Sequence, residues 1–213
     1  MISAGGFATV WHLAAYGLGW ISPTVAAALM VGAESGRSGV RAFFRQILRW
    51  PLSPWYLAGL LLPSVALLAG LAADSALRGS APAVWLQLAP GLGLVGPPLA
   101  EEYGWRGYAL PRLQRLAPPL AAALLLGALW ALWHLPTFFL PGARPALFWP
   151  VALWLVSASV LIAWLYNHTG GALTVALVTH AGLNLNLVPL DPVLSLRPFV
   201  LGAACLALAA AAV

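Results

Sequence analysis

Residues 118–136 read PPLAAALLLGALWALWHLP, an apolar run without Asp, Glu, Lys or Arg that ends on a histidine, a leucine and a proline. A transmembrane α-helix needs about 20 such residues to cross a hydrocarbon layer of ~30 Å. The apolar residues are continuous and do not alternate with polar ones, which favours a helix over the strand of a barrel. The stretch therefore predicts a helix that crosses a membrane.

Six further runs of the same kind occur along the chain. Of its 213 residues, 62% are hydrophobic and 7% are charged, and the mean hydropathy is +0.91. So few charged side chains cannot cover a water-soluble globule of this size. We place the predicted spans at about 7–32, 54–73, 82–104, 118–140, 147–166, 171–189 and 197–213. The expected fold is all-α: a polytopic membrane helical bundle of about seven transmembrane helices, forming a single domain over residues 1–213.

Arginine supplies all ten cations, against five acidic residues, and its distribution predicts the orientation of the bundle. Seven arginines lie on one side of the predicted spans, namely Arg37, Arg41, Arg45, Arg49, Arg106, Arg112 and Arg115. Three lie on the other side, namely Arg78, Arg144 and Arg197. Because arginine is retained on the cytoplasmic side, we expect the larger group in the cytoplasm and the N-terminus outside.

The segment RAFFRQILRW, residues 41–50, places Arg41, Arg45 and Arg49 four residues apart, with apolar residues mostly on the opposite side. This spacing predicts an amphipathic helix that lies in the membrane interface. Anionic headgroups account for the positive charge, and the sequence carries no nucleic-acid motif. Membrane lipids are therefore expected partners, and nucleic acid is not.

Ionisable residues inside apolar runs mark candidate functional positions, because each costs ~2.5 kcal/mol or more near the bilayer centre. The first cluster lies in PPLAEEYGWRGYALPRL, residues 97–113. Glu102 and Arg106 are four residues apart, so on a helix they share a face and are expected to form a structural ion pair. Glu101 is rotated by about 100° from Glu102 and does not share that partner. It is the candidate for a reactive carboxylate.

Two further clusters lie in later spans. His134 ends the run LWALWHLP, and His180 and Asn184 lie four apart in LVTHAGLNL, on one helix face. Each taken alone fits a hydrogen-bonded packing residue or a polar contact between helices. At ~1.5 Å per residue, however, Glu101, His134 and His180 lie at similar depths in their spans. A shared polar pocket near the middle of the membrane follows from that agreement.

These clusters, in this order, resemble the CPBP family of intramembrane proteases, also called the Abi or CAAX-protease-and-bacteriocin-processing family. The family pattern is E-E-x-x-x-R, then F-x-x-x-H, then H-x-x-x-N. Here the second element is carried by Trp130 and His134, with Trp in place of Phe, which conserves aromatic bulk. The resemblance covers about residues 95–190, the motif-bearing core, and includes GWRGYALPRLQ and YNHTGGALTVALVTHAGLN.

The resemblance implies an integral membrane endopeptidase related to the Ras-converting-enzyme type of CAAX prenyl endopeptidase. We expect it in a prokaryotic plasma membrane, with its site inside the bilayer and accessible from the cytoplasm. Carried over to this chain, Glu101 is the general base and His134 helps it to activate a water. His180 and Asn184 would then stabilise the oxyanion. The expected substrate is a hydrophobic or lipidated peptide.

A metal-dependent version of the site remains open at this point. Glu101, His134 and His180 would form a two-histidine, one-carboxylate set for zinc with an open position for water. We favour a route without a cofactor, because the compact H-E-x-x-H arrangement is absent from the sequence. Asn184 is also a poor zinc ligand and a good oxyanion donor.

Two other classes of function compete with the protease. One is a non-enzymatic membrane scaffold, such as a bacteriocin-immunity protein of the same fold, in which the polar cluster binds a partner helix. The other is a transporter of protons or small ions, since intramembrane Glu and His are typical relay groups. Intact motifs argue against the first class. The sequence shows no inverted repeat, which argues against the second.

Overall fold

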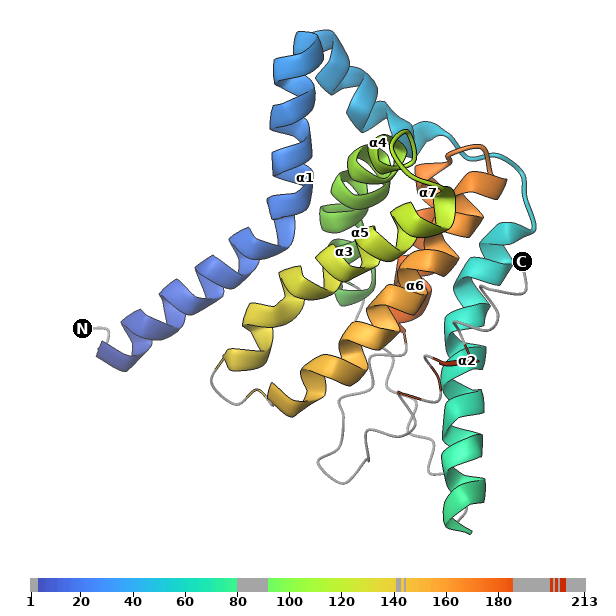
Figure 1. Cartoon of the computed structure of the whole chain (residues 1–213). Coiled ribbons are helices and arrows are strands. Elements are labelled where there is room, and N and C mark those ends of the chain that lie inside the picture. Colours follow the sequence, from blue (N-terminus) through green and yellow to red (C-terminus); the bar gives the residue numbers. More distant parts are fainter. Residues whose placement is uncertain are drawn as a thin grey trace.

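The computed structural model describes residues 4–79, 92–140, 143, 145–185, 200, 202 and 204–205. Every regular element among these residues is helical, which confirms the predicted all-α class (Figure 1). The α-helices are α1 (Ala4–Arg45), α2 (Trp55–Arg78), α3 (Leu92–Gly104), α4 (Leu110–Leu113), α5 (Pro119–His134), α6 (Phe148–His168) and α7 (Leu173–Asn184). Short helical turns are η1 (Gln46–Leu48), η2 (Trp105–Ala109), η3 (Leu135–Phe139) and η4 (Pro145–Leu147).

Three helical stretches in the described part of the chain are long and apolar enough to cross a membrane. They are Trp55–Arg78, Pro119–Phe139 and Pro145–His168. They coincide with the second, fourth and fifth predicted spans, and the protein is a helical membrane protein. Among the described residues three of the about seven predicted spans meet this criterion, and α7, in the sixth, has 12 residues. A helix of that length reaches only about 18 Å.

Parts of the other predicted spans fall outside the described residues. The third prediction, 82–104, is helical from Leu92 onward, and its first ten residues are not described. Two further parts are not described either: the end of the sixth predicted span, beyond Leu185, and most of the seventh, 197–213, including Arg197. The first prediction, 7–32, lies within the much longer α1.

Helix α1 is bent by its own sequence (Figure 1). Pro23 lies in its interior and has no N–H to donate to the carbonyl of Gly19, which kinks a helix. The Ser22 hydroxyl donates to that carbonyl at 2.7 Å. Further on, Gly36 has φ 61° and ψ −160°, and the chain turns back on itself there. Only glycine adopts this backbone conformation without strain.

The segment after Gly36 contains the predicted amphipathic helix. It is helical to Arg45 and continues as η1, with Phe44 and Leu48 exposed. Phe43 is buried, and its ring lies 5.3 Å from that of Tyr103 on α3. The prediction of a helix is therefore confirmed to Arg45, while its position in the membrane interface stays a prediction.

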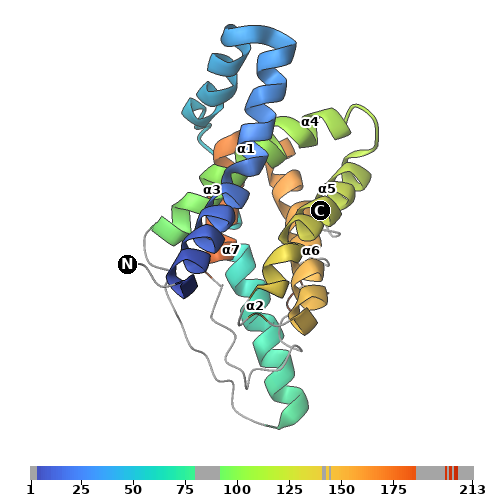
Figure 2. The ribbon, with the colours of Figure 1, turned by 90° about the vertical axis from the view of Figure 1, so that its left-hand side faces the viewer.

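The core lies where α5, α6 and α7 meet, and α7 is the central element. Leu126, Ile162 and Val175, one from each helix, are fully buried in the same cluster. Helix α7 packs against α2, α3 and α6, while α5 packs along α6 and α1 along α3. Figure 2, turned by 90° from Figure 1, shows α1 and α3 side by side. This arrangement brings α3, α5 and α7, the helices that carry the predicted site residues, into one bundle.

Candidate active site

A buried ion pair lies at the end of α3. Glu102 and Arg106 are both 0% exposed, and Arg106 Nη1 donates to Glu102 Oε1 at 2.7 Å. Arg106 is on η2, a π-helical turn that follows α3 directly. Such turns occur mostly as single interruptions in α-helices and often at functional sites. The pair expected from the four-residue spacing is thus present in the structure.

Helix α7 joins this ion pair through His180. Its Nδ1 lies 2.8 Å from Glu102 Oε1, the same oxygen that Arg106 contacts. Arg106 and a protonated Nδ1 of His180 can both donate to this one carboxylate oxygen. The spacing of the sequence did not indicate this second partner, because it links residues 78 positions apart.

Glu101 faces a different partner, the indole of Trp130 on α5. Trp130 Nε1 donates to Glu101 Oε2 at 2.7 Å, and the two residues are 1% and 3% exposed. The sequence reasoning treated Trp130 as aromatic bulk and missed this bond. The signal was available, because a buried indole N–H usually finds an acceptor.

His134 lies one turn beyond Trp130 at the end of α5. Its Nδ1 is 2.8 Å from the Trp130 carbonyl oxygen. A carbonyl oxygen only accepts, so Nδ1 carries the proton and Nε2 of the neutral ring is an acceptor. The ring of Trp133 lies edge-on to His134 at 4.8 Å. His134 therefore presents an unprotonated nitrogen from a half-buried ring.

The indole of Trp130 brings the separate residues together. Its ring lies 5.1 Å from the His180 ring and 5.8 Å from the His134 ring, both edge-on. The guanidinium of Arg106 lies 4.7 Å from the same ring. With the bond to Glu101, this one side chain contacts residues from α3, η2, α5 and α7.

Asn184 lies one turn after His180 on α7 and is buried, at 6% exposed. Its amide nitrogen Nδ2 has no hydrogen-bond partner among the described residues. A buried donor without a partner costs about 1–3 kcal/mol. This donor is therefore available to a ligand or a transition state.

Small residues allow α7 to lie directly against α2. A Cβ at Gly182 would meet the backbone oxygens of Leu60 and Gly59 at 2.7 and 2.8 Å. Packing of this kind lets helix backbones approach closely in membranes. Because Gly182 lies between His180 and Asn184, this close contact fixes the depth and rotation of both side chains.

The turn before α7 is also tied to the rest of the chain. Gly170 and Gly171 have φ values of 62° and 79°, a conformation that glycine adopts without strain. Arg49 Nη1 donates to the Gly170 carbonyl at 2.8 Å. Thr174 donates to the Arg49 carbonyl at 2.8 Å and its oxygen lies 2.6 Å from the Tyr56 hydroxyl. The start of α7 is thereby held in place.

The described residues do not form a metal site by their arrangement. Among them, no group of three His, Cys, Asp or Glu side chains is placed to hold a metal ion. Glu101, His134 and His180 belong to the residues so described, and the indole of Trp130 lies against all three. The metal-free route and the two-histidine, one-carboxylate alternative both stay predictions.

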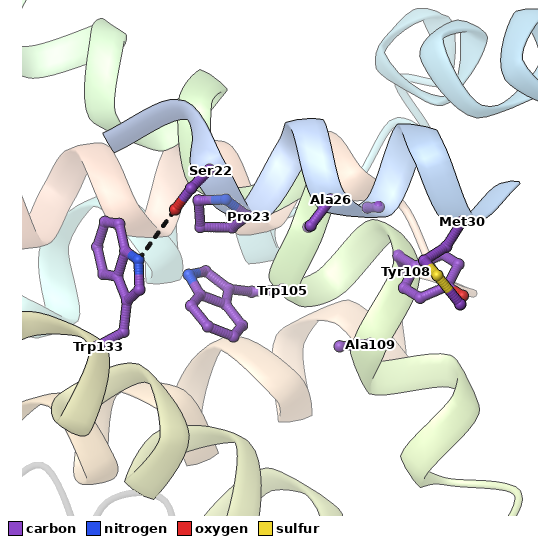
Figure 3. A pocket seen from close by; sticks show the side chains of 10 residues that line it. Ser22, Pro23, Ala26, Met30, Trp105, Tyr108, Ala109 and Trp133 are labelled. Atoms are coloured by element: carbon purple, nitrogen blue, oxygen red, sulfur yellow. Dashed lines mark hydrogen bonds between the residues drawn. The ribbon is translucent and has the colours of Figure 1, made fainter. Parts of the chain in front are cut away.

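An apolar cavity of about 350 Å³ lies beside this cluster (Figure 3). Its lining comes from α1, η2 and α5 and includes Ser22, Pro23, Met30, Trp105, Tyr108 and Trp133. Trp133, which contacts the His134 ring, donates through Nε1 to the Ser22 hydroxyl at 3.1 Å. The Trp133 ring therefore lies between the cavity and His134.

The part of the chain that contains this cluster is similar to known proteins. A family model described as type II CAAX prenyl endopeptidase, Rce1-like, matches residues 82–186. That range contains Glu101, His134, His180 and Asn184. This stretch is therefore similar to the Rce1-like family. The resemblance that the three motifs indicated is thereby confirmed, and the Rce1-like segment carries every predicted site residue.

A curated relative supports the same assignment. CAAX prenyl protease 2 of Methanococcus maripaludis is 29% identical to this chain over 94 residues, which are 40% of the chain and 35% of the relative. The match thus spans about a third of the relative's length.

Proposed function

We propose that the protein is an endopeptidase that hydrolyses a peptide bond inside the membrane, without a metal ion. The observation that carries the proposal is the convergence of Glu101, His134 and His180, from three different helices, on the buried ring of Trp130. Ionisable groups are costly inside a membrane protein unless they have a function or a partner. The match of residues 82–186 to the Rce1-like family model supports hydrolysis as that function.

Glu101 and His134 would activate the attacking water. Water is a poor nucleophile at neutral pH, so a positioned base has to accept its proton. His134 offers Nε2 as an acceptor, because its Nδ1–H is directed at the Trp130 carbonyl. Glu101 offers a carboxylate that one hydrogen bond from Trp130 holds in place. The two groups would share one water and pass its proton to the leaving amine.

Asn184 and His180 would stabilise the negative charge on the carbonyl oxygen of the substrate. The Asn184 amide is a buried donor without a partner among the described residues. For His180 to donate from Nε2, both of its ring nitrogens must carry a proton, and Glu102 lies where a counter-ion is needed. A donor aimed at a developing oxyanion in a water-poor site contributes about 3 kcal/mol.

The substrate we propose is a membrane-associated peptide with a lipidated residue, such as a prenylated cysteine. The name of the curated relative, CAAX prenyl protease 2, supports this class. So does the apolar cavity beside His134, which would accept a hydrocarbon chain. We also propose that the site opens to the cytoplasm of a prokaryotic cell, as the distribution of arginine predicts.

The experiment uses the full chain in liposomes and an internally quenched peptide with a farnesylated cysteine, here called the lipidated probe. We expect wild type to cleave it and Glu101→Gln to lose at least about 10³-fold in kcat/KM. The same peptide without the lipid is expected to react poorly. Full cleavage by Glu101→Gln would exclude the mechanism. A folded wild type that cleaves no lipidated probe would favour a scaffold function.

The cavity has its own test. Ala26 and Ala109 line it, and a tryptophan at either position would fill it. We expect Ala109→Trp to raise KM for the lipidated probe and to leave kcat nearly unchanged, because the reacting groups are not touched. Leu124→Trp, at an exposed position of α5, is the matched control. An unchanged KM for Ala109→Trp would place the lipid elsewhere.

A further inference from the structure

We infer that Trp130 is a positioning residue that sets Glu101 and His134 relative to one another, through its side chain and its main chain at once. The inference rests on the proposed function, in which these two groups share a water. In this role Trp130 acts through its hydrogen bonds as well as through the packing of its ring.

The side chain of Trp130 holds the carboxylate. Its Nε1–H donates to Glu101 Oε2 at 2.7 Å, a short bond from a neutral donor to a carboxylate oxygen. Glu101 follows Pro97 and Pro98 in α3, which have no N–H to donate to the carbonyls of Gly93 and Leu94, so the helix before Glu101 lacks two backbone bonds. A bond from α5 therefore fixes the direction in which the carboxylate points.

The main chain of Trp130 holds the imidazole. Its carbonyl oxygen lies 2.8 Å from His134 Nδ1, which selects the tautomer with an unprotonated Nε2. His134 is followed by Pro136 within η3, so α5 ends at this point. The same residue thus orients both the carboxylate from α3 and the imidazole from its own helix.

The ring of Trp130 is itself held tightly. It is 1% exposed and lies edge-on to His180 and His134 and against the guanidinium of Arg106. Aromatic and cation–π contacts of this kind contribute about 0.5–2 kcal/mol each. A ring fixed by contacts on several sides has little freedom to turn its N–H away from Glu101. The bond to the carboxylate is therefore preorganised.

Phenylalanine would keep most of these contacts and lose only the donor. The motif that this chain resembles carries Phe at the corresponding place, so the N–H is a feature of this chain's own sequence. The function of Glu101 should therefore depend here on a bond that phenylalanine cannot make. This dependence separates positioning by the N–H from simple filling of the core.

The experiment removes the N–H and keeps the shape. Replacing Trp130 with 3-benzothienylalanine substitutes sulfur for the indole N–H, and Trp130→Phe is the genetically simple version. For both we expect kcat on the lipidated probe to fall about 10- to 100-fold with KM within about twofold of wild type. The matched control is Trp164→Phe, since Trp164 Nε1 is buried without a hydrogen-bond partner among the described residues. Wild-type kcat is expected for that control.

A second readout does not depend on turnover. In ¹⁵N-tryptophan-labelled protein, the indole N–H resonance that disappears in Trp130→Phe should lie downfield and move upfield in Glu101→Leu. An indole resonance insensitive to Glu101→Leu would overturn the inference. A benzothienyl variant with wild-type kcat would also overturn the inference. If Glu101→Gln is inactive at the same time, the proposed function remains intact. Cleavage by Glu101→Gln would instead overturn the proposed function itself.

Discussion

His180 Nδ1 lies 2.8 Å from Glu102 Oε1, and this contact joins α7 to the buried ion pair of α3 and η2. Arg106 donates to the same oxygen, so two almost completely buried side chains, Arg106 and His180, depend on one buried carboxylate. Removing one member of such a set leaves the others without a partner in a water-poor interior. The relationship therefore links the stability of the bundle to the position of His180.

Glu102→Gln should destabilise the protein strongly. Arg106 would then be a fully buried cation without its counter-ion, and breaking a buried pair in this way costs about 3–5 kcal/mol. The thermal unfolding midpoint in detergent is the measurement. Glu102→Gln combined with Arg106→Met, which removes both charges, should recover much of the loss. A double variant less stable than either single variant would contradict this account of the pair.

Gly182→Ala should displace α7 from α2 and impair both stability and turnover. The added Cβ would lie 2.7 Å from a backbone oxygen of Leu60, and the overpacking costs about 1–3 kcal/mol. His180 and Asn184 would move with the helix. The control is Gly96→Ala on α3, where a Cβ meets nothing within 4 Å and should stabilise the helix slightly. Equal effects of the two substitutions would rule out the close contact as the cause.

The part of α1 just before the turn at Gly36 should lose an acid-sensitive contact when Glu34 is replaced. The Tyr108 hydroxyl donates to Glu34 at 2.7 Å and Arg112 donates to its other oxygen, and these bonds lower the pKa of Glu34 below its ordinary 4.5. Stabilisation by a carboxyl group with a lowered pKa is complete above pH 4.5 and disappears as the pH falls through the folded-state value.

The measurement for Glu34 compares unfolding midpoints of wild type and Glu34→Gln from pH 7 to pH 3. We expect the wild type to be the more stable at neutral pH and the difference to shrink below about pH 4.5. High salt should reduce the difference, because the pair is exposed. A difference that grows on acidification would have the wrong sign for this contact.

Chelation should leave the activity on the lipidated probe unchanged. Glu101 is engaged by the Trp130 N–H, and no group of three His, Cys, Asp or Glu side chains among the described residues is placed to hold a metal ion. The measurement is the cleavage rate after dialysis against 1,10-phenanthroline, with the non-chelating 1,7-isomer as control. If chelation abolishes the activity and only zinc restores it, the mechanism is metal-dependent and the metal-free proposal is wrong.

The sequence predicted the helical class and the clusters well, because both follow from local patterns. Long apolar runs determine membrane helices, and the four-residue spacing of Glu102 and Arg106 determines a shared face. The motifs also indicated the family that the comparison confirmed. The number of spans was predicted less well, since the sixth apolar run, 171–189, contains a helix α7 of only 12 residues among the described residues.

Long-range partners could not be predicted from the sequence. The bonds of Glu101 to Trp130 and of Glu102 to His180 join residues 29 and 78 positions apart. Which of several polar groups meets which depends on helix rotation, and Gly182 and the turn at Gly36 set rotations that no local pattern encodes. Trp130 was therefore assigned a packing role, and its hydrogen bond became visible only in the folded chain.

The most direct test of the central claim is a double-mutant cycle on kcat for Glu101→Gln and His134→Ala, measured on the lipidated probe in liposomes. If both groups act on one water, removing the second after the first costs little more, and the double variant should be about as slow as the slower single variant. Effects that multiply, or a single variant with wild-type kcat, would show that Glu101 and His134 do not form one reaction centre.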